Sequence, residues 1–163
     1  MSKSIVIMRH ALTESGWQKH DTDRALLPDG EAQTERVALR MAAAGITPDA
    51  VWASHALRAQ QTAEIVSHTL CPNIDIEVVR PLYGDDEHEI ANIIELCPDT
   101  IGSLLIVGHN PLVSRLVCRL SGSDGFGWFA TSDAVWLEFG TDHWADIATA
   151  PITGKMKFSI MSK

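Results

Sequence analysis

The sequence predicts an α/β fold, a three-layer sandwich in which a mostly parallel central sheet is flanked by helices. Short apolar runs of strand length alternate along the chain with longer segments whose apolar residues recur at helical spacing. Because helices of this kind connect parallel strands, the alternation favours a parallel sheet. Two of the apolar runs lead into a histidine, His10 and His109, followed by loop or helix-start residues.

The chain begins with a run that is typical of a buried strand. Residues 4–8 (Ser-Ile-Val-Ile-Met) lead into Arg9 and His10, and a polar loop is expected over residues 13–24. A helix should follow over about residues 28–44. The proline at its start suits a first helical turn, and the glycine behind it is a common helix stop.

The next strand and helix bring a serine and an arginine to one region. Residues 50–53 (Ala-Val-Trp-Ala) predict a short strand, and the side chain of the following Ser54 can cap a helix. Arg58 lies one turn after Ser54. It stands off the apolar stripe of that helix, which consists of Ala56, Ala59, Ala63, Val66 and Leu70.

The rest of the chain continues the same pattern. Residues 74–79 alternate like a half-exposed strand, residues 81–85 indicate a loop, and a helix should run from near Asp86 to Pro98. A buried strand is expected over residues 104–107.

Behind that strand Asn110 is expected to cap a helix, with Pro111 at its first position. A β-hairpin made of residues 134–139 and 144–148 should then complete the fold.

Length and composition favour a single domain over residues 1–163. The chain has 163 residues, of which 45% are hydrophobic, and no linker-like or repetitive stretch divides it. Its three cysteines are odd in number and widely spaced, which argues against a disulfide framework or a thiolate zinc site. No stretch is long and apolar enough to span a membrane and no signal-peptide pattern is present, so we expect a cytoplasmic protein.

Charge narrows the classes of partner. The formal net charge of −8 disfavours nucleic acid and anionic membrane as partners, since both require a basic surface. An anionic substrate would need a local basic pocket, which draws attention to Arg9 and Arg58. The acidic stretches at residues 20–23 and 85–89 match neither a calcium loop nor a zinc-binding helix, so we expect no metal and no cofactor. Nothing in the pattern indicates an oligomeric state.

The two strand-end histidines predict a site. Carboxyl ends of parallel strands meet at one edge of a sheet, so His10 and His109 should face one crevice. Together with Arg9, Arg58 and nearby helix N-termini they would suit an oxyanion such as phosphate. A neutral imidazole is also a capable nucleophile toward phosphorus. The competing interpretation is that His10 and His109 are each a hydrogen-bonded structural residue. The other five histidines, at positions 20, 55, 68, 88 and 143, are expected on the surface.

These motifs, in this order and spread over nearly the whole chain, resemble the histidine phosphatase superfamily, which implies a phosphoglycerate mutase-like fold. The resemblance rests on Arg9-His10-Ala11, on Ser54 with Arg58-Ala59 and Gln61-Thr62, and on Gly108-His109-Asn110-Pro111. Within it, the chain most resembles the small SixA-like phosphohistidine phosphatases. That closer match rests on Asp23-Arg24-Ala25-Leu26, Leu82-Tyr83-Gly84 and Phe129-Ala130-Thr131.

The resemblance implies a role for each matching residue. His10 would be the nucleophile that becomes phosphorylated, and Arg9, Arg58 and His109 would hold the phosphoryl oxygens. Thr13 and Ser54 would add contacts to the phosphate or to the pocket wall. Larger members of the superfamily also use a carboxylate as general acid, and Asp85 stands nearest to that place.

The expected function is a phosphatase that works through a phosphohistidine intermediate and hydrolyses phosphohistidine on a partner protein. A departing imidazole needs less help from an acid than an alkoxide does, so an absent or displaced acid favours this substrate. One alternative is a phosphomonoesterase for a small phosphorylated metabolite, with Asp85 as acid. Another, of a different class, is a phosphate-binding module without turnover.

Overall fold

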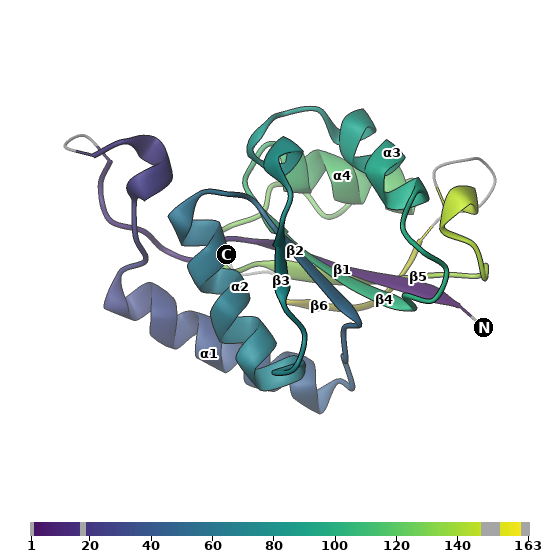
Figure 1. The fold of residues 1–163 in the computed structure, drawn as a ribbon, viewed down its shortest axis with the longest axis horizontal. Helices are drawn as coiled ribbons and strands as arrows, with labels where there is room; N and C mark the ends of the chain where they lie inside the picture. The colour runs from purple at the N-terminus through teal and green to yellow at the C-terminus, as the bar shows by residue number, and fades with distance from the viewer. Residues whose placement is uncertain (1, 17–18, 148–153, 161–163) are drawn as a thin grey trace.

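The computed structural model describes residues 2–16, 19–147 and 154–160 (Figure 1). They form a six-stranded sheet with the strand order β3-β2-β4-β1-β5-β6. The strands are β1 (Lys3–Arg9), β2 (Ala50–Ala53), β3 (Ile76–Val78), β4 (Ser103–Gly108), β5 (Ala134–Phe139) and β6 (Lys155–Ile160). The helices are α1 (Pro28–Ala43), α2 (Leu57–Leu70), α3 (Glu87–Glu95) and α4 (Leu112–Ser121), with short 3₁₀ turns η1 (Asp21–Asp23), η2 (Arg80–Tyr83) and η3 (Trp144–Asp146).

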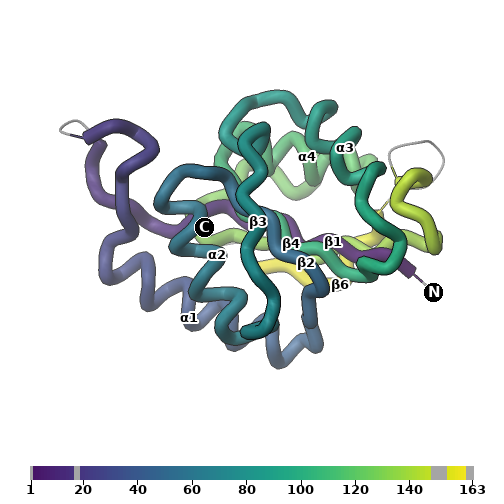
Figure 2. Tube along the Cα trace, viewed as in Figure 1, coloured from purple at the N-terminus to yellow at the C-terminus, as the bar shows by residue number. Residues whose placement is uncertain are grey.

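The sheet is parallel over its first four strands and antiparallel at one side. β3, β2, β4 and β1 run parallel, whereas β5 pairs antiparallel with β1 and β6 antiparallel with β5. Helices α1 and α2 cover one face and α3 and α4 cover the other (Figures 1 and 2). This arrangement confirms the predicted α/β sandwich with a mostly parallel sheet.

Alternation along the strands divides the core into two layers. In β1, Ile5 and Ile7 pack into the cluster beneath α3 and α4, whereas Val6 and Met8 pack into the cluster beneath α1 and α2. Successive side chains of a strand point to opposite faces, so a continuous apolar run is required where helices cover both faces. The central strands are therefore the most buried part of the molecule, and they carry the two histidines.

The predicted closing hairpin is confirmed for its first strand and wrong for its second. β5 forms as expected, but its partner is β6 at residues 155–160, and Trp144–Asp146 is a 3₁₀ turn. Trp144 is fully buried, its indole Nε1 donates to the carbonyl of Ile101 at 2.7 Å, and its backbone N–H donates to Asp99. The apolar character of this segment thus reflects two buried side chains of a turn, Trp144 and Ile147, and not a strand. Residue 148 lies outside the described residues.

Two predicted helix caps also differ from the structure. Pro111 stands at the N-cap of α4, and the Asn110 side chain instead donates to the carbonyl of Phe129 at 2.6 Å. Ser54 lies before the N-cap of α2, where its Oγ accepts from the backbone N–H of Ala56 at 3.2 Å. Both side chains are thereby committed to the loops that form the site. The helix start expected near Asp86 is confirmed: Asp86 is the N-cap of α3, and its side chain accepts from two backbone N–H groups of that helix.

No helix among the described residues is long and apolar enough to cross a membrane.

Candidate active site

His10 and His109 lie at the carboxyl ends of two neighbouring parallel strands. The register of β1 and β4 pairs Arg9 with Gly108, so the residue after each comes at the same height. The backbone N–H of His10 donates to the carbonyl of Gly108 at 2.9 Å, which continues the ladder one step beyond the strands. Both histidines are buried, and their ring centroids are 5.2 Å apart. The structure thus brings together the two histidines that the sequence placed in one crevice.

The imidazole of His10 is held in one orientation and kept neutral. Its Nδ1 lies 2.8 Å from the carbonyl oxygen of Ala11, an acceptor, so Nδ1 carries the proton and Nε2 keeps a free lone pair. Burial, with smaller contributions from the positive charges of Arg58 and Arg9, lowers the pKa of His10 to about 4, although the bond to Ala11 opposes this shift. Near neutral pH the ring is therefore an uncharged nucleophile.

His109 is also neutral, and one of its ring nitrogens has no partner among the described residues. Its Nε2 lies 2.7 Å from Oγ of Ser54, and its Nδ1 is buried without a hydrogen bond. Burial lowers the pKa of His109 to about 3, with the neighbouring His10 and Arg58 acting in the same direction. Because Ser54 already accepts from a backbone N–H, its hydroxyl can donate to Nε2, which leaves Nδ1 as a donor.

Two arginines flank the histidines, and each is fixed at its outer end. Nη1 of Arg9 donates to the carbonyl of Phe129 at 3.0 Å. Arg58 donates to Asp21 twice, from Nη1 to the backbone oxygen at 2.7 Å and from Nη2 to Oδ2 at 3.0 Å. In both arginines Nε is buried without a partner among the residues described. Unsatisfied buried donors are costly, so a cluster of them indicates a site for a ligand.

We call the group of His10, Arg9 Nε, Arg58 Nε and His109 Nδ1 the cradle. Its charge comes from two guanidiniums, while both imidazoles are neutral. The cradle thus holds three buried N–H donors without a partner among the described residues, on side chains whose rings or charges act on His10, and this donor set suits an oxyanion that carries several oxygens, such as a phosphoryl group. No group of three His, Cys, Asp or Glu side chains with metal-binding geometry occurs in the described part of the chain.

Asp21 and Tyr83 are also at this site, although neither was among the predicted site residues; Tyr83 entered the sequence analysis only as part of the Leu82-Tyr83-Gly84 motif. The Asp21 carboxylate accepts hydrogen bonds from Arg58, from Arg24 and from the hydroxyl of Tyr83. These donors hold the pKa of Asp21 well below its usual range, with the Tyr83 bond as the largest cause. The Tyr83 ring in turn meets His109 edge-on at 5.5 Å. The two loops η1 and η2 thus join over one side of the cradle.

The remaining candidates lie around the cradle. Oγ1 of Thr13 accepts from Nη2 of Arg24 at 2.6 Å, so this threonine orients a neighbouring guanidinium. Asp85 is exposed and, among the described residues, forms no hydrogen bond or ion pair with the cradle. His55, expected on the surface, is instead half-buried and contacts Tyr83 with ring centroids 4.8 Å apart. Its position directly after Ser54 was the signal available for it.

The sequence of this chain is similar to a known protein family and to a known protein. Residues 5–82 match the histidine phosphatase superfamily (branch 1). An uncharacterized protein of Mycobacterium tuberculosis, Rv1276c, is 30% identical over 154 residues, which cover 86% of this chain and 91% of that protein.

Solved structures share the fold at lower identity. The protein histidine phosphatase SixA in complex with tungstate superposes with a TM-score of 0.79 at 23% identity, over 97% of this chain and 96% of the other. A protein from Agrobacterium tumefaciens assigned as phosphohistidine phosphatase SixA gives a TM-score of 0.82 at 21% identity, over 99% of both chains. The mycobacterial glucosyl-3-phosphoglycerate phosphatase Rv2419c gives 0.67 at 13% identity, over 96% and 98%.

Proposed function

Because this chain belongs to the histidine phosphatase superfamily (branch 1), we propose that it is a phosphatase whose catalytic nucleophile is His10 and whose substrate is phosphohistidine on a partner protein. The observation that carries the proposal is the pairing of a neutral His10, with Nε2 free, and three unpartnered N–H donors beside it. A phosphate-binding module would have use for the donors but not for an oriented nucleophile.

The reaction would proceed in two steps. In the first, Nε2 of His10 attacks phosphorus, the bond from phosphorus to the substrate imidazole breaks, and that imidazole leaves with a proton taken from solvent. Arg9, Arg58 and His109 would donate to the phosphoryl oxygens as negative charge shifts toward them. In the second step a water molecule attacks phosphorus, which releases inorganic phosphate and returns His10 to its neutral form.

The surroundings of the cradle favour a nitrogen leaving group. An alkoxide departs readily only with a general acid, whereas an imidazole has a conjugate-acid pKa near neutrality and needs little help. Asp21, whose carboxylate is bonded to Arg58 of the cradle, has its pKa held low by three donors and is therefore a poor acid. Asp85 is exposed and makes no contact with the cradle.

The three cysteines agree with a reducing compartment. Cys71, Cys97 and Cys118 are all free thiols, as in cytoplasmic proteins, and we propose a cytoplasmic setting on that ground.

Trapping the intermediate tests the proposal. Rapid quenching with ³²P-labelled phosphohistidine should leave acid-labile, base-stable label on the wild type and none on H10A. H68A, which alters an exposed histidine of α2, is the matched control and should be labelled like the wild type. Hydrolysis at the wild-type rate by H10A would overturn the mechanism. Faster turnover of alkyl phosphates than of phosphohistidine would instead indicate a phosphatase for small metabolites.

A further inference from the structure

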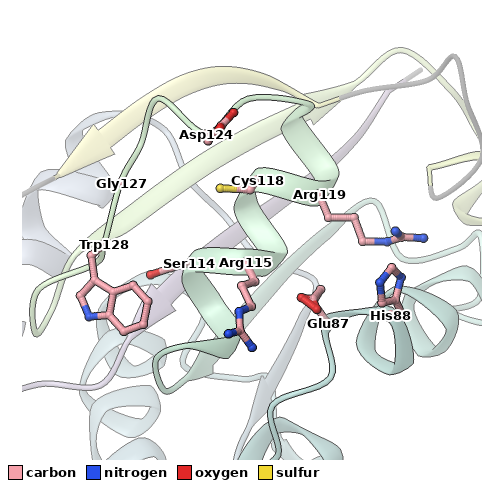
Figure 3. A pocket seen from close by; sticks show the side chains of 9 residues that line it. All are labelled: Glu87, His88, Ser114, Arg115, Cys118, Arg119, Asp124, Gly127 and Trp128. Carbon is pink, nitrogen blue, oxygen red and sulfur yellow. The ribbon is translucent and has the colours of Figure 1, made fainter.

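A hollow of about 740 Å³ lies on the α3–α4 side of the molecule, outside the cradle. It is bounded by α4, by the first turn of α3 and by the loop that precedes Phe129 (Figure 3). Its lining side chains are Glu87, His88, Ser114, Arg115, Cys118, Arg119, Asp124 and Trp128, with Gly127 between the last two. None of these residues takes part in the reaction proposed above.

The hollow and the cradle share a wall. Ser114 lines the hollow, accepts from the backbone N–H of Phe129 at 3.0 Å and donates to Oδ1 of Asn110 at 2.5 Å. The carbonyl of the same Phe129 accepts from Nη1 of Arg9 and from the Asn110 amide. A chain segment bound in the hollow would therefore lie one residue away from a group that fixes a cradle arginine.

The chemistry of the hollow combines free positive charge with an exposed aromatic face. Arg115 and Arg119 are exposed, one turn apart on α4, and neither guanidinium forms an ion pair or hydrogen bond with any described residue. Trp128 is 66% exposed, an unusual state for so large an apolar side chain. In Figure 3 its indole points toward the Arg115 end of α4, while Arg119 extends toward His88.

Two acidic residues also line the hollow, but neither is paired with an arginine there. Glu87 stands at the start of α3 and Asp124 on the loop beyond α4, and neither forms an ion pair with Arg115 or Arg119. On a chain with a net charge of −8, two unengaged guanidiniums beside an exposed tryptophan are a distinct local feature. The two guanidiniums favour an anionic partner, and the exposed indole favours a partner that also carries an apolar side chain.

We propose that this hollow docks an acidic segment, bearing at least one apolar side chain, of the protein that presents the phosphohistidine. The proposal rests on the proposed function and adds the chemistry of the partner. The ten residues of α4 extend over about 15 Å, and an extended peptide covers about 3.3 Å per residue. About five residues of the partner would therefore span the length of α4 and so pass both arginines.

A binding measurement tests the surface without relying on catalysis. Cys118 is partly exposed within the hollow, whereas Cys71 and Cys97 are buried, so alkylation by iodoacetamide reports on occupancy. The probe is a synthetic peptide with a Glu-rich, Leu-containing segment, and its control has Gln at each Glu position. The Glu peptide should slow alkylation severalfold and the Gln peptide should not; C118S confirms which thiol reacts.

Charge reversal assigns the effect to the arginines. R115E/R119E should abolish protection, and W128A should weaken it. R36E/R40E should retain it, because this matched pair stands four residues apart and exposed on α1, beneath the other face of the sheet. Equal protection by the Glu and Gln peptides, or protection that survives in R115E/R119E, would overturn the proposal. Protection by a DNA oligonucleotide equal to that by the peptide would overturn its assignment to a protein partner.

Turnover then links the surface to the cradle. With phosphohistidine added to both peptides, the Glu version should show about tenfold higher kcat/KM through a lower KM, and the advantage should disappear in R115E/R119E and at high salt. Free phosphohistidine should be hydrolysed equally by wild type and R115E/R119E. Normal turnover without preference for the Glu peptide would refute the docking site alone. Protection of Cys118 without turnover of any phosphohistidine substrate would refute the proposed function and leave the peptide site established.

Discussion

The side chain of Arg58 is 7% exposed and that of Asp21 is 46% exposed, yet the two are joined by an ion pair of 3.0 Å at the mouth of the cradle. A second bond, from Arg58 to the backbone oxygen of Asp21, fixes the guanidinium plane. Phe129 holds Arg9 in a comparable way through its carbonyl. Each cradle arginine thus has at least one terminal nitrogen restrained by the protein, while its buried Nε has no partner among the described residues.

Removing the Asp21 carboxylate should separate catalysis from binding. In D21A the guanidinium of Arg58 loses an acceptor and gains freedom, so we expect kcat to fall about tenfold, as for a misplaced stabilising donor. Inorganic phosphate, measured as a competitive inhibitor, should bind no more weakly, because an anion that occupied Arg58 has been removed. D23A, on the same 3₁₀ turn but exposed and without a side-chain hydrogen bond to the described residues, should behave like the wild type.

Truncating a donor of the cradle should lower kcat more than D21A does. R9A, R58A and H109A should each lower kcat by about a hundredfold or more, the loss typical of removing one donor to a developing oxyanion. R40A alters an exposed arginine of α1 and should change kcat less than twofold. Circular dichroism of each variant separates loss of fold from loss of chemistry. Wild-type rates in R58A would contradict the proposed cradle.

The two buried histidines should make the protein less stable in mild acid. The pKa values of His10 and His109 lie at about 4 and about 3 in the folded state, below the ordinary histidine value of about 6.5. Between the folded-state pKa values and 6.5, the unfolded chain binds more protons than the folded chain does. Lowering the pH through this range therefore favours unfolding. Stability is unaffected above about pH 7 and falls as the pH drops through 6.5, by up to about 1.4 kcal/mol per pH unit for each histidine.

Urea unfolding measured between pH 7 and 4.5 checks this dependence. H10Q should flatten the decline by removing one titrating group, whereas H68A, an exposed histidine, should leave the slope unchanged. The same slope in H10Q and wild type would show that His10 is not held neutral by the fold.

Asp85 distinguishes the two enzyme hypotheses. It is exposed and makes no contact with the cradle among the described residues, so D85N should change kcat on a phosphohistidine substrate less than threefold. A phosphomonoesterase with Asp85 as acid would instead lose about a hundredfold or more of its activity on alkyl phosphates. Steady-state assays of D85N on both substrate classes decide between them.

The strand-end histidines could be predicted because their placement follows from a general property of parallel sheets. Parallel strands all end at the same edge of their sheet. Because β1 and β4 are parallel neighbours, the residues that follow them, His10 and His109, lie side by side at that edge. Arg58 could be placed for a similar reason, one turn into a helix that starts at the same edge.

The contacts of Asp21 could not be predicted in this way. It reaches Arg58 across 37 residues of sequence and Tyr83 across 62, and the two loops involved carry no hydrophobic periodicity. The error over residues 144–148 has a related origin, because a buried Trp144 in a loop and an apolar strand residue look alike in sequence. Loop paths depend on side-chain hydrogen bonds that form only after the sheet is complete.

The paired strands β1 and β4 form a fixed centre, and the loops at their carboxyl ends form a more variable surround. The amide hydrogen of His10, bonded to Gly108 at the end of the most buried pair of strands, should exchange with solvent only when the sheet itself opens. Loop residues that make no bond to His10, Arg9 or Arg58 can, by contrast, change without moving these side chains. New substrates could thus be acquired by altering the perimeter alone, with the chemistry at the strand ends inherited intact.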